Sequence, residues 1–234
     1  MITRNFLILT LWIAIANTPV FAGQSDGIIY QALYIETGAA AFDDNADTME
    51  WDIDGWVGTD ENKLTFKSEG ERKNSATEHT ELWVMYSRNV DTFWDLQIGL
   101  RNDIKPHSLS YAVIGVEGLV PYFLETEAHL FVSEDGDLSA RLRQQKELLI
   151  TQKLILEPYA EINLVASDVP ELKLGSGFSS AEYGMQMRYE ITRGFAPYVD
   201  LKYERKFGET ATIAEHHGKS SSDFIGMLGV RWIF

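Results

Sequence analysis

Polar and apolar side chains alternate with a period of two over most of the chain. The segment 93–103 shows this clearly, because apolar residues occupy every second position and polar or charged residues lie between them. A helical period would scatter the two sets around the axis, whereas a strand separates them onto two faces. The same alternation recurs in 121–132, 179–191 and 223–234. Each segment is therefore predicted to be a strand with one apolar face and one wet face.

The alternating segments divide the chain into twelve predicted strands. Working back from the carboxyl end, they lie at about 223–234, 196–207, 179–191, 154–166, 137–149, 121–132, 109–118, 93–103, 78–88, 62–71, 50–57 and 28–37. The connections alternate in length, because short ones such as 58–61 and 89–92 separate long ones such as 38–49, 167–178 and 208–222. An even strand number, with short turns at one end and long loops at the other, is typical of an outer-membrane barrel.

A water-soluble β-sandwich also alternates, so the composition of the two faces must distinguish the classes. Here the apolar faces are rich in Trp, Tyr, Leu and Met, while the opposite faces carry acids and bases that cannot form a dry core. Beyond residue 22 no stretch approaches the length of a membrane-spanning helix. The predicted fold class is therefore all-β: a transmembrane antiparallel up-and-down β-barrel of about 12 strands, with both termini periplasmic.

The first 22 residues have the features of a secretory signal peptide. Arg4 lies in a short basic start, 6–16 is an apolar core, and Ala22 supplies the small residue expected at a cleavage site. We expect residues 1–22 to be removed, residues 23–27 to form a short N-terminal segment, and residues 28–234 to form the barrel. The chain contains no cysteine, so a disulfide framework is excluded. Its net charge of -15 argues against nucleic acid as a partner and favours a cationic ligand.

Five long blocks of the sequence carry a resemblance to a known family. The chain resembles the copper resistance protein B family (CopB/PcoB) in the blocks 51–71, 94–103, 111–142, 151–164 and 195–211, which follow one another in the same order. The resemblance implies an outer-membrane barrel of a Gram-negative bacterium, in a copper-tolerance system that works beside a periplasmic multicopper oxidase. Many members carry a Met- and His-rich tail ahead of the barrel, which 23–27 does not supply, so metal chemistry is expected in the barrel or its loops.

The last residue, Phe234, falls on the apolar face of the last predicted strand. Similar outer-membrane proteins end in an aromatic residue that the barrel assembly machinery reads, so we expect that machinery as a partner. Outer-membrane lipid and lipopolysaccharide are also expected, and the acidic segment 43–47 is a candidate for the divalent cations that bridge lipopolysaccharide. The oxidase is a further possible partner implied by the resemblance.

Without cysteine, the copper ligands available to the chain are Met, His, Asp and Glu. Copper(I) favours thioether and imidazole, and copper(II) favours imidazole with carboxylate. Residues two apart on a strand face the same cavity about 7 Å apart, so His79 with Glu81, and Glu127 with His129, are candidate chelating pairs. The candidate ligands predicted to face the lumen are His79, Glu81, Met85, Glu125, Glu127, His129 and Met227.

Two further candidates, His216 and His217, lie in the last long loop and are weaker, because a flexible loop does not fix their geometry. A one-residue slip in register would turn Met85 and Met227 to the lipid and remove both from the set. Met185 and Met187 are predicted to face lipid as simple hydrophobic residues. The competing interpretation is structural, because lumen carboxylates can pair with Lys63, Lys67, Arg101, Arg141, Arg143, Arg188, Lys202 and Lys206.

The sequence predicts a barrel whose acidic lumen binds copper ions and passes them. The alternatives are a copper-sequestering or oxidase-docking barrel without transport, and a general small-solute pore. Strand number does not decide among them, since eight strands close on packed side chains, sixteen leave a channel, and twelve lie between. No Gly-x-Ser-x-Gly block occurs, so no enzymatic activity and no organic cofactor are expected.

Overall fold

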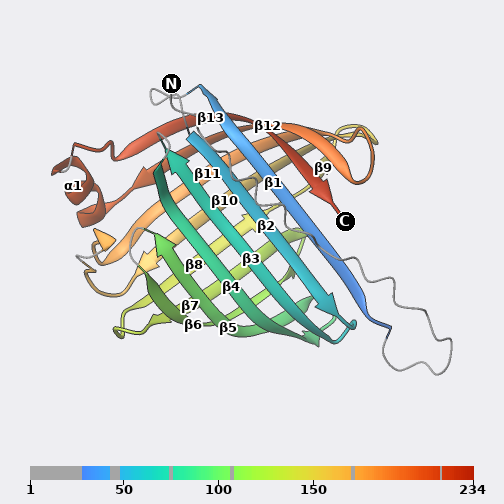
Figure 1. Cartoon of the computed structure of the whole chain (residues 1–234), viewed down its shortest axis with the longest axis horizontal. Helices are drawn as coiled ribbons and strands as arrows, with labels where there is room; N and C mark the ends of the chain where they lie inside the picture. The colour runs from blue at the N-terminus through green and yellow to red at the C-terminus, as the bar shows by residue number, and fades with distance from the viewer. Residues whose placement is uncertain (1–27, 43–47, 74–75, 106–107, 170–171, 217) are drawn as a thin grey trace, which may run out of the picture.

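The chain folds into a closed antiparallel β-barrel (Figure 1). The computed structural model describes residues 28–42, 48–73, 76–105, 108–169, 172–216 and 218–234, so the predicted signal peptide (1–22), the segment 23–27 and the acidic segment 43–47 lie outside it. The strands are β1 (Tyr30–Phe42), β2 (Thr48–Gly58), β3 (Asn62–Lys73), β4 (Ala76–Asp91), β5 (Trp94–Lys105), β6 (Leu109–Val120), β7 (Leu124–Ser133), β8 (Leu138–Gln145), β9 (Leu148–Leu149), β10 (Leu154–Val165), β11 (Gly177–Tyr189), β12 (Phe195–Lys206) and β13 (Ser222–Ile233).

The two short strands β8 and β9 together occupy one position in the barrel wall, beside β10. The sequence predicts them as a single strand over 137–149. They are separated at the point where Pro158 of β10 faces them, because proline has no N–H to donate to the ladder. Lys146 still donates its backbone N–H to the Pro158 carbonyl at 3.1 Å. The wall therefore has the twelve strand positions that the alternation predicts, and the predicted fold class is confirmed.

The barrel closes where β1 pairs with β13. The backbone N–H of Leu33 donates to the Phe234 carbonyl at 3.1 Å, and the N–H of Phe234 donates to the Leu33 carbonyl at 2.9 Å. The beginning of β1 and the end of β13 consequently lie at the same end of the barrel, which is the end with the short turns. No helix among the described residues is long and apolar enough to cross a membrane.

The predicted faces of the strands are confirmed along the wall. Large apolar side chains such as Leu96, Ile98 and Leu100 are exposed on the outer face, while Gln97, Arg101 and Asp103, at the alternate positions of the same strand, are buried inside. The faces predicted for four methionines are also confirmed. Met85 and Met227 are buried on the inside, whereas Met185 and Met187 are exposed on the outside.

The last long connection differs from the prediction. The segment 208–222 was expected to be a flexible loop, but it contains helix α1 (Gly208–His216). Thr210 of this helix is buried and accepts a hydrogen bond from the backbone N–H of Gly175 at 2.9 Å, which ties α1 to the preceding long connection. The helix has Glu209 in its first turn and His216 in its last, the arrangement that suits a helix dipole. It was missed because it has no apolar stripe.

One side of the barrel interior is filled by apolar side chains. We call Trp83, Met85, Leu109, Tyr111, Val113 and Phe131 the inner cluster; they come from β4, β6 and β7. The ring centroids of Trp83 and Phe131 are 5.1 Å apart and nearly perpendicular, a favourable edge-to-face contact. Leu172, from the connection between β10 and β11, packs against the cluster. The inner cluster therefore fills part of the interior beside β4, β6 and β7, and Leu109, Tyr111 and Phe131 also line the remaining space.

Candidate functional site: the lumen cavity

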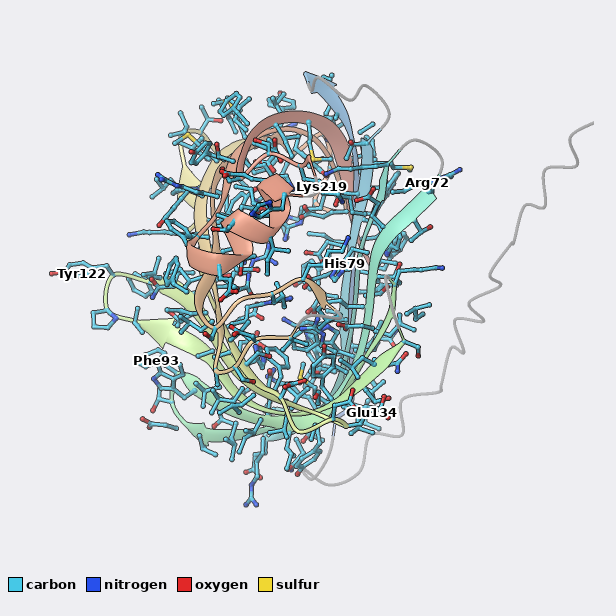
Figure 2. The ribbon with its side chains drawn as sticks, turned by 90° about the vertical axis from the view of Figure 1, so that its left-hand side faces the viewer. Arg72, His79, Phe93, Tyr122, Glu134 and Lys219 are labelled. Atoms are coloured by element: carbon cyan, nitrogen blue, oxygen red, sulfur yellow. The ribbon has the colours of Figure 1, made fainter. Side chains whose placement is uncertain are left out.

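A cavity of about 1180 Å³ occupies the barrel interior, and we call it the lumen cavity. Figure 2 looks into the barrel from the α1 end and shows His79 on the inner side of the wall, whereas Phe93 and Tyr122 project outward. All twelve strand positions contribute lining residues. Among the described residues, the lining contains nineteen Asp or Glu side chains but seven Lys or Arg side chains, which are Lys67, Arg101, Arg141, Arg143, Arg188, Lys202 and Arg231. The wall therefore carries a large excess of negative charge.

The basic residues inside the barrel form ion pairs with inward carboxylates, most of which belong to this acidic lining. Such pairing is the structural interpretation that competed with metal binding in the sequence analysis. All eight basic residues named in that interpretation form ion pairs. The pairs join Lys63 to Asp95, Lys67 to Asp54 and Glu127, Arg101 to Glu81 and Asp103, Arg141 to Glu69, Glu81 and Glu161, Arg143 to Asp52, Arg188 to Glu147 and Glu157, Lys202 to Glu50 and Glu182, and Lys206 to Glu204.

Glu81 is the centre of the densest network. Its side chain is 1% exposed, and its carboxylate lies 2.7 Å from Arg101 Nη2 and 2.9 Å from Arg141 Nη2. His79 Nε2 lies 2.7 Å from Glu81 Oε1, and Trp83 Nε1 donates to Glu81 Oε2 at 2.9 Å. Both carboxylate oxygens are therefore occupied by donors. The predicted pair of His79 and Glu81 does form, but as a hydrogen-bonded contact within an arginine-rich network.

Arg101 also covers part of the inner cluster. Its guanidinium carbon lies 4.9 Å from the ring centroid of Tyr111 and 5.0 Å from that of Phe131, within range of cation–π attraction. The guanidinium thus packs on two rings of the inner cluster that line the lumen cavity beside it. Met85 also belongs to the inner cluster and is 0% exposed.

The seven predicted lumen ligands do face inward, but they differ in their access to the cavity. His79, Glu81, Glu125, Glu127 and Met227 line the lumen cavity, whereas Met85 and His129 are not among its lining residues. Met85 belongs to the inner cluster, and His129 Nε2 is engaged with Gln97 Oε1 at 2.8 Å. Glu127 pairs with Lys67 at 2.5 Å, so it does not form an isolated chelating pair with His129.

Within the described residues, no group of three or more His, Cys, Asp or Glu side chains is arranged to hold a metal ion. The ligand assignments therefore remain predictions. Of the two loop candidates, His216 lies in the last turn of α1 and His217 lies outside the described residues.

The connection between β10 and β11 turns into the barrel at its loop end. Val169 and Leu174 form an isolated bridge, and both line the lumen cavity together with Leu172. The backbone N–H of Ser176 donates to Asp168 Oδ1 at 2.6 Å. This hydrogen bond to the charged form lowers the pKa of the Asp168 carboxyl below its ordinary value. The connection therefore carries an ionised carboxylate directly beside Val169 in the sequence.

Sequence reasoning missed two inward residues on the wall opposite the inner cluster. Gln186 of β11 and Asp200 of β12 line the lumen cavity, and each has a buried side-chain oxygen for which the described residues supply no hydrogen-bond partner. Alternation places both on the inner face. Their juxtaposition depends on how β11 and β12 pair, for which the sequence gives no local signal.

Comparison with known proteins agrees with this geometry. The family profile described as "Copper resistance protein B precursor (CopB)" matches residues 30–234. Copper resistance protein B of Escherichia coli is 35% identical over 189 residues, which cover 80% of this chain and 64% of that protein. A homolog from Pseudomonas syringae pv. tomato is 37% identical over 187 residues, with the same coverage of 80% and 64%. The chain thus spans less than two thirds of the length of these relatives.

Among solved structures, the NanC porin superposes with a TM-score of 0.58 and 12% sequence identity, covering 86% of this chain and 98% of the porin chain. At that identity the likeness shows the fold alone. It is consistent with the closed barrel described above.

Proposed function

The chain belongs to the copper resistance protein B family, and on that premise we propose that its barrel passes copper ions across the outer membrane through the lumen cavity. The observation that carries this proposal is the acidic cavity wall, in which the described lining residues include nineteen carboxylates and seven basic side chains. In a confined space with low-dielectric walls, such an excess lowers the energy of a cation and repels anions. The family and the porin-like fold locate the chain in the outer membrane and indicate a non-enzymatic membrane protein.

Passage requires that a cation bind well enough to enter and weakly enough to leave. Many of the lumen carboxylates are already held by arginine or lysine, as Glu81 is by Arg101 and Arg141. Such paired carboxylates contribute to the electrostatic field without being free to wrap around a metal ion. This arrangement favours passage over tight sequestration.

Preference for copper over hard cations needs softer ligands. We assign this role to residues that line the lumen cavity, chiefly Met227 and His79. Met85 and His129 have no comparable access, so they are expected to stabilise the wall. The other carboxylates of the predicted set, Glu125 and Glu127, would supply charge along the path.

The partners of this activity are also part of the proposal. We propose that the barrel assembly machinery reads Phe234 and that lipid and lipopolysaccharide surround the outer face. A role beside a periplasmic multicopper oxidase rests on the family resemblance alone.

The test is entry of copper into liposomes that contain the purified barrel and an enclosed copper-sensitive dye. We expect copper to enter faster than zinc and faster than an uncharged sugar, because the wall combines negative charge with a thioether. Equal passage of all three would instead establish a general pore. Copper retained by the protein without entry would establish sequestration.

A matched pair of variants links the entry rate to lumen charge. Glu125 lines the lumen cavity, and its carboxylate accepts a hydrogen bond from Gln145 Nε2 at 3.0 Å. Glu134 lies in the connection after β7, outside the cavity lining. Glu125→Gln is expected to slow copper entry, whereas Glu134→Gln is expected to leave it unchanged. Equal rates in both variants would remove Glu125 from the path.

A further inference from the structure

We infer that Gln186, Asp200 and Met227 form a discrete copper-binding site in the wall of the lumen cavity, on β11, β12 and β13. The inference rests on the proposed function, because it specifies where along the cavity a copper ion is held. Its ligands are one amide oxygen, one carboxylate oxygen and one thioether sulfur, so it differs from a cluster of three His, Cys, Asp or Glu side chains, which the described residues do not contain. We call these three residues the three-strand site.

The strand register brings the three residues together. Gln186 is directly opposite Asp200 in the β11–β12 ladder, and Asp200 is directly opposite Met227 in the β12–β13 ladder. All three line the lumen cavity. Directly opposed residues on neighbouring strands have Cβ atoms about 4.5–5.5 Å apart. Their side chains can therefore approach one cation from three adjacent strands.

Two buried oxygen atoms at this site have no hydrogen-bond partner among the described residues. Gln186 is 7% exposed and Asp200 is 8% exposed. Within the part of the chain that the structure describes, neither Gln186 Oε1 nor Asp200 Oδ1 has a hydrogen-bond partner. A buried acceptor without a partner is costly, and a bound ion or water removes that cost. The two oxygens are thus the first observation that points to a ligand here.

The other polar atom of each side chain is fixed, so the free oxygen has a defined direction. Gln186 Nε2 donates to Glu36 Oε2 at 2.9 Å. Tyr159 Oη donates to Asp200 Oδ2 at 2.9 Å. Each side chain is oriented by one atom and keeps its remaining oxygen available. Such preorganisation is what a cation site requires.

The third ligand is the thioether of Met227, which is 3% exposed and is held against the closing seam of the barrel. Gly38 and Gly229 are directly opposed across the β1–β13 seam. Because neither has a side chain, the space beside Gly38 is open to the side chains of Met227 and Tyr198. A Cβ atom added at Gly38 would lie 3.3 Å from Met227 Cε and 2.8 Å from Tyr198 Oη. Glycine is therefore needed there for Met227 and Tyr198 to occupy this position. A thioether adds preference for a soft ion such as copper(I).

The charges around the three-strand site leave Asp200 available to a cation. Lys202 Nζ is 2.6 Å from Glu50, and Arg231 Nε is 3.2 Å from Glu36, so both neighbouring cations have carboxylate partners of their own. Among the ion pairs of the described residues, none includes Asp200. Lys202 affects Asp200 by electrostatic attraction without forming an ion pair with it. The charge of Lys202 is balanced by Glu50 and by Glu182, whose carboxylate lies 3.7 Å from Lys202 Nζ.

The chain offers a matched control for the thioether. Met85 also faces inward and is 0% exposed, but it packs in the inner cluster and does not line the lumen cavity. We would measure copper binding to the purified barrel by equilibrium dialysis, with copper(I) under reductant and with copper(II). Met227→Leu and Asp200→Asn are each expected to weaken binding at least about tenfold. Met85→Leu is expected to leave it within about twofold of the wild-type barrel.

X-ray absorption of the bound copper supplies a readout that a merely structural role would not move. A sulfur neighbour of copper is expected in the wild-type barrel and in Met85→Leu, and it should be absent in Met227→Leu. The folded state of each variant would be checked by its circular dichroism. Unchanged binding in both Met227→Leu and Asp200→Asn would overturn the site and assign the two free oxygens to water.

The outcomes also separate this inference from the proposed function. Copper entry into liposomes without any effect of Met227→Leu on binding or on the sulfur signal would overturn the three-strand site and leave conduction standing. Binding with a sulfur neighbour but without entry would support the site and overturn conduction. Loss of binding in Met85→Leu equal to that in Met227→Leu would show that the effect comes from altered packing, which also overturns the site.

Discussion

Replacing Glu81 with alanine is expected to destabilise the folded barrel by about 3–5 kcal/mol, because it removes one member of a buried ionic network. Glu81 is 1% exposed and lies 2.7 Å from Arg101 and 2.9 Å from Arg141. The substitution would leave two guanidinium groups without their common partner. Arg101 retains Asp103, and Arg141 retains Glu69 and Glu161, so the loss should be large without abolishing the fold.

The measurement is the free energy of unfolding of the purified barrel in detergent, from denaturant titration followed by tryptophan fluorescence. Glu125→Ala is the control, because Glu125 accepts a hydrogen bond from the neutral Gln145 and should lose only about 1 kcal/mol. If Glu81→Ala were no more destabilising than this control, the arginine network would not stabilise the wall. His79 and Glu81 would then be better candidates for a metal pair than the present geometry indicates.

Deleting Phe234 is expected to reduce the amount of assembled barrel in the outer membrane severely. Phe234 exchanges both backbone hydrogen bonds with Leu33, at 3.1 and 2.9 Å, at the end of the seam that closes the barrel. Its ring is also exposed on the outer face. Deletion removes these hydrogen bonds and, on our proposal, the aromatic group that the assembly machinery reads. The folded fraction in membranes can be followed by its resistance to heat and detergent on gels.

Two substitutions at the same position separate these effects. Phe234→Ala keeps the backbone hydrogen bonds to Leu33 but loses the ring, and Phe234→Tyr keeps both. We expect assembly in cells to fall in the order tyrosine, alanine, deletion, with the tyrosine variant close to wild type. Refolding of purified protein in detergent should be little affected by Phe234→Ala. Normal assembly of the alanine variant in cells would contradict recognition of the aromatic ring.

One part of the lumen stabilises the barrel, and another part is proposed to bind copper. The arginine network around Glu81 and the inner cluster fill and stiffen one side of the barrel. The opposite side holds the three-strand site, where Asp200 forms no ion pair with the described residues and Met227 reaches the cavity. The acidic wall attracts cations along the whole path, while the thioether of Met227 lies at the three-strand site. Copper selectivity and barrel stability should therefore respond to different substitutions.

The sequence by itself determined the class of fold and, on the strands where alternation is clear, the inward or outward direction of the side chains. Successive side chains of a strand point to opposite faces, so the alternation depends only on the strand's own sequence and not on which strands lie beside it. This is why the strand positions, the closed barrel and the inward direction of Met85 and Met227 could all be predicted. Helix α1 was missed because its nine residues carry no periodic apolar signal. The break between β8 and β9 was missed because it depends on Pro158 in the next strand.

Only the tertiary structure decided which inward residues can meet an ion. Met85 and Met227 have the same alternation, yet one lies within the inner cluster and the other lines the cavity. The partners that decide this come from distant parts of the chain; Lys202 and Glu50, for example, are 152 positions apart. Gln186, Asp200 and Met227 likewise become neighbours only through strand pairing. Alternation fixes the face of the wall that a side chain occupies, but closure of the barrel fixes what that side chain meets.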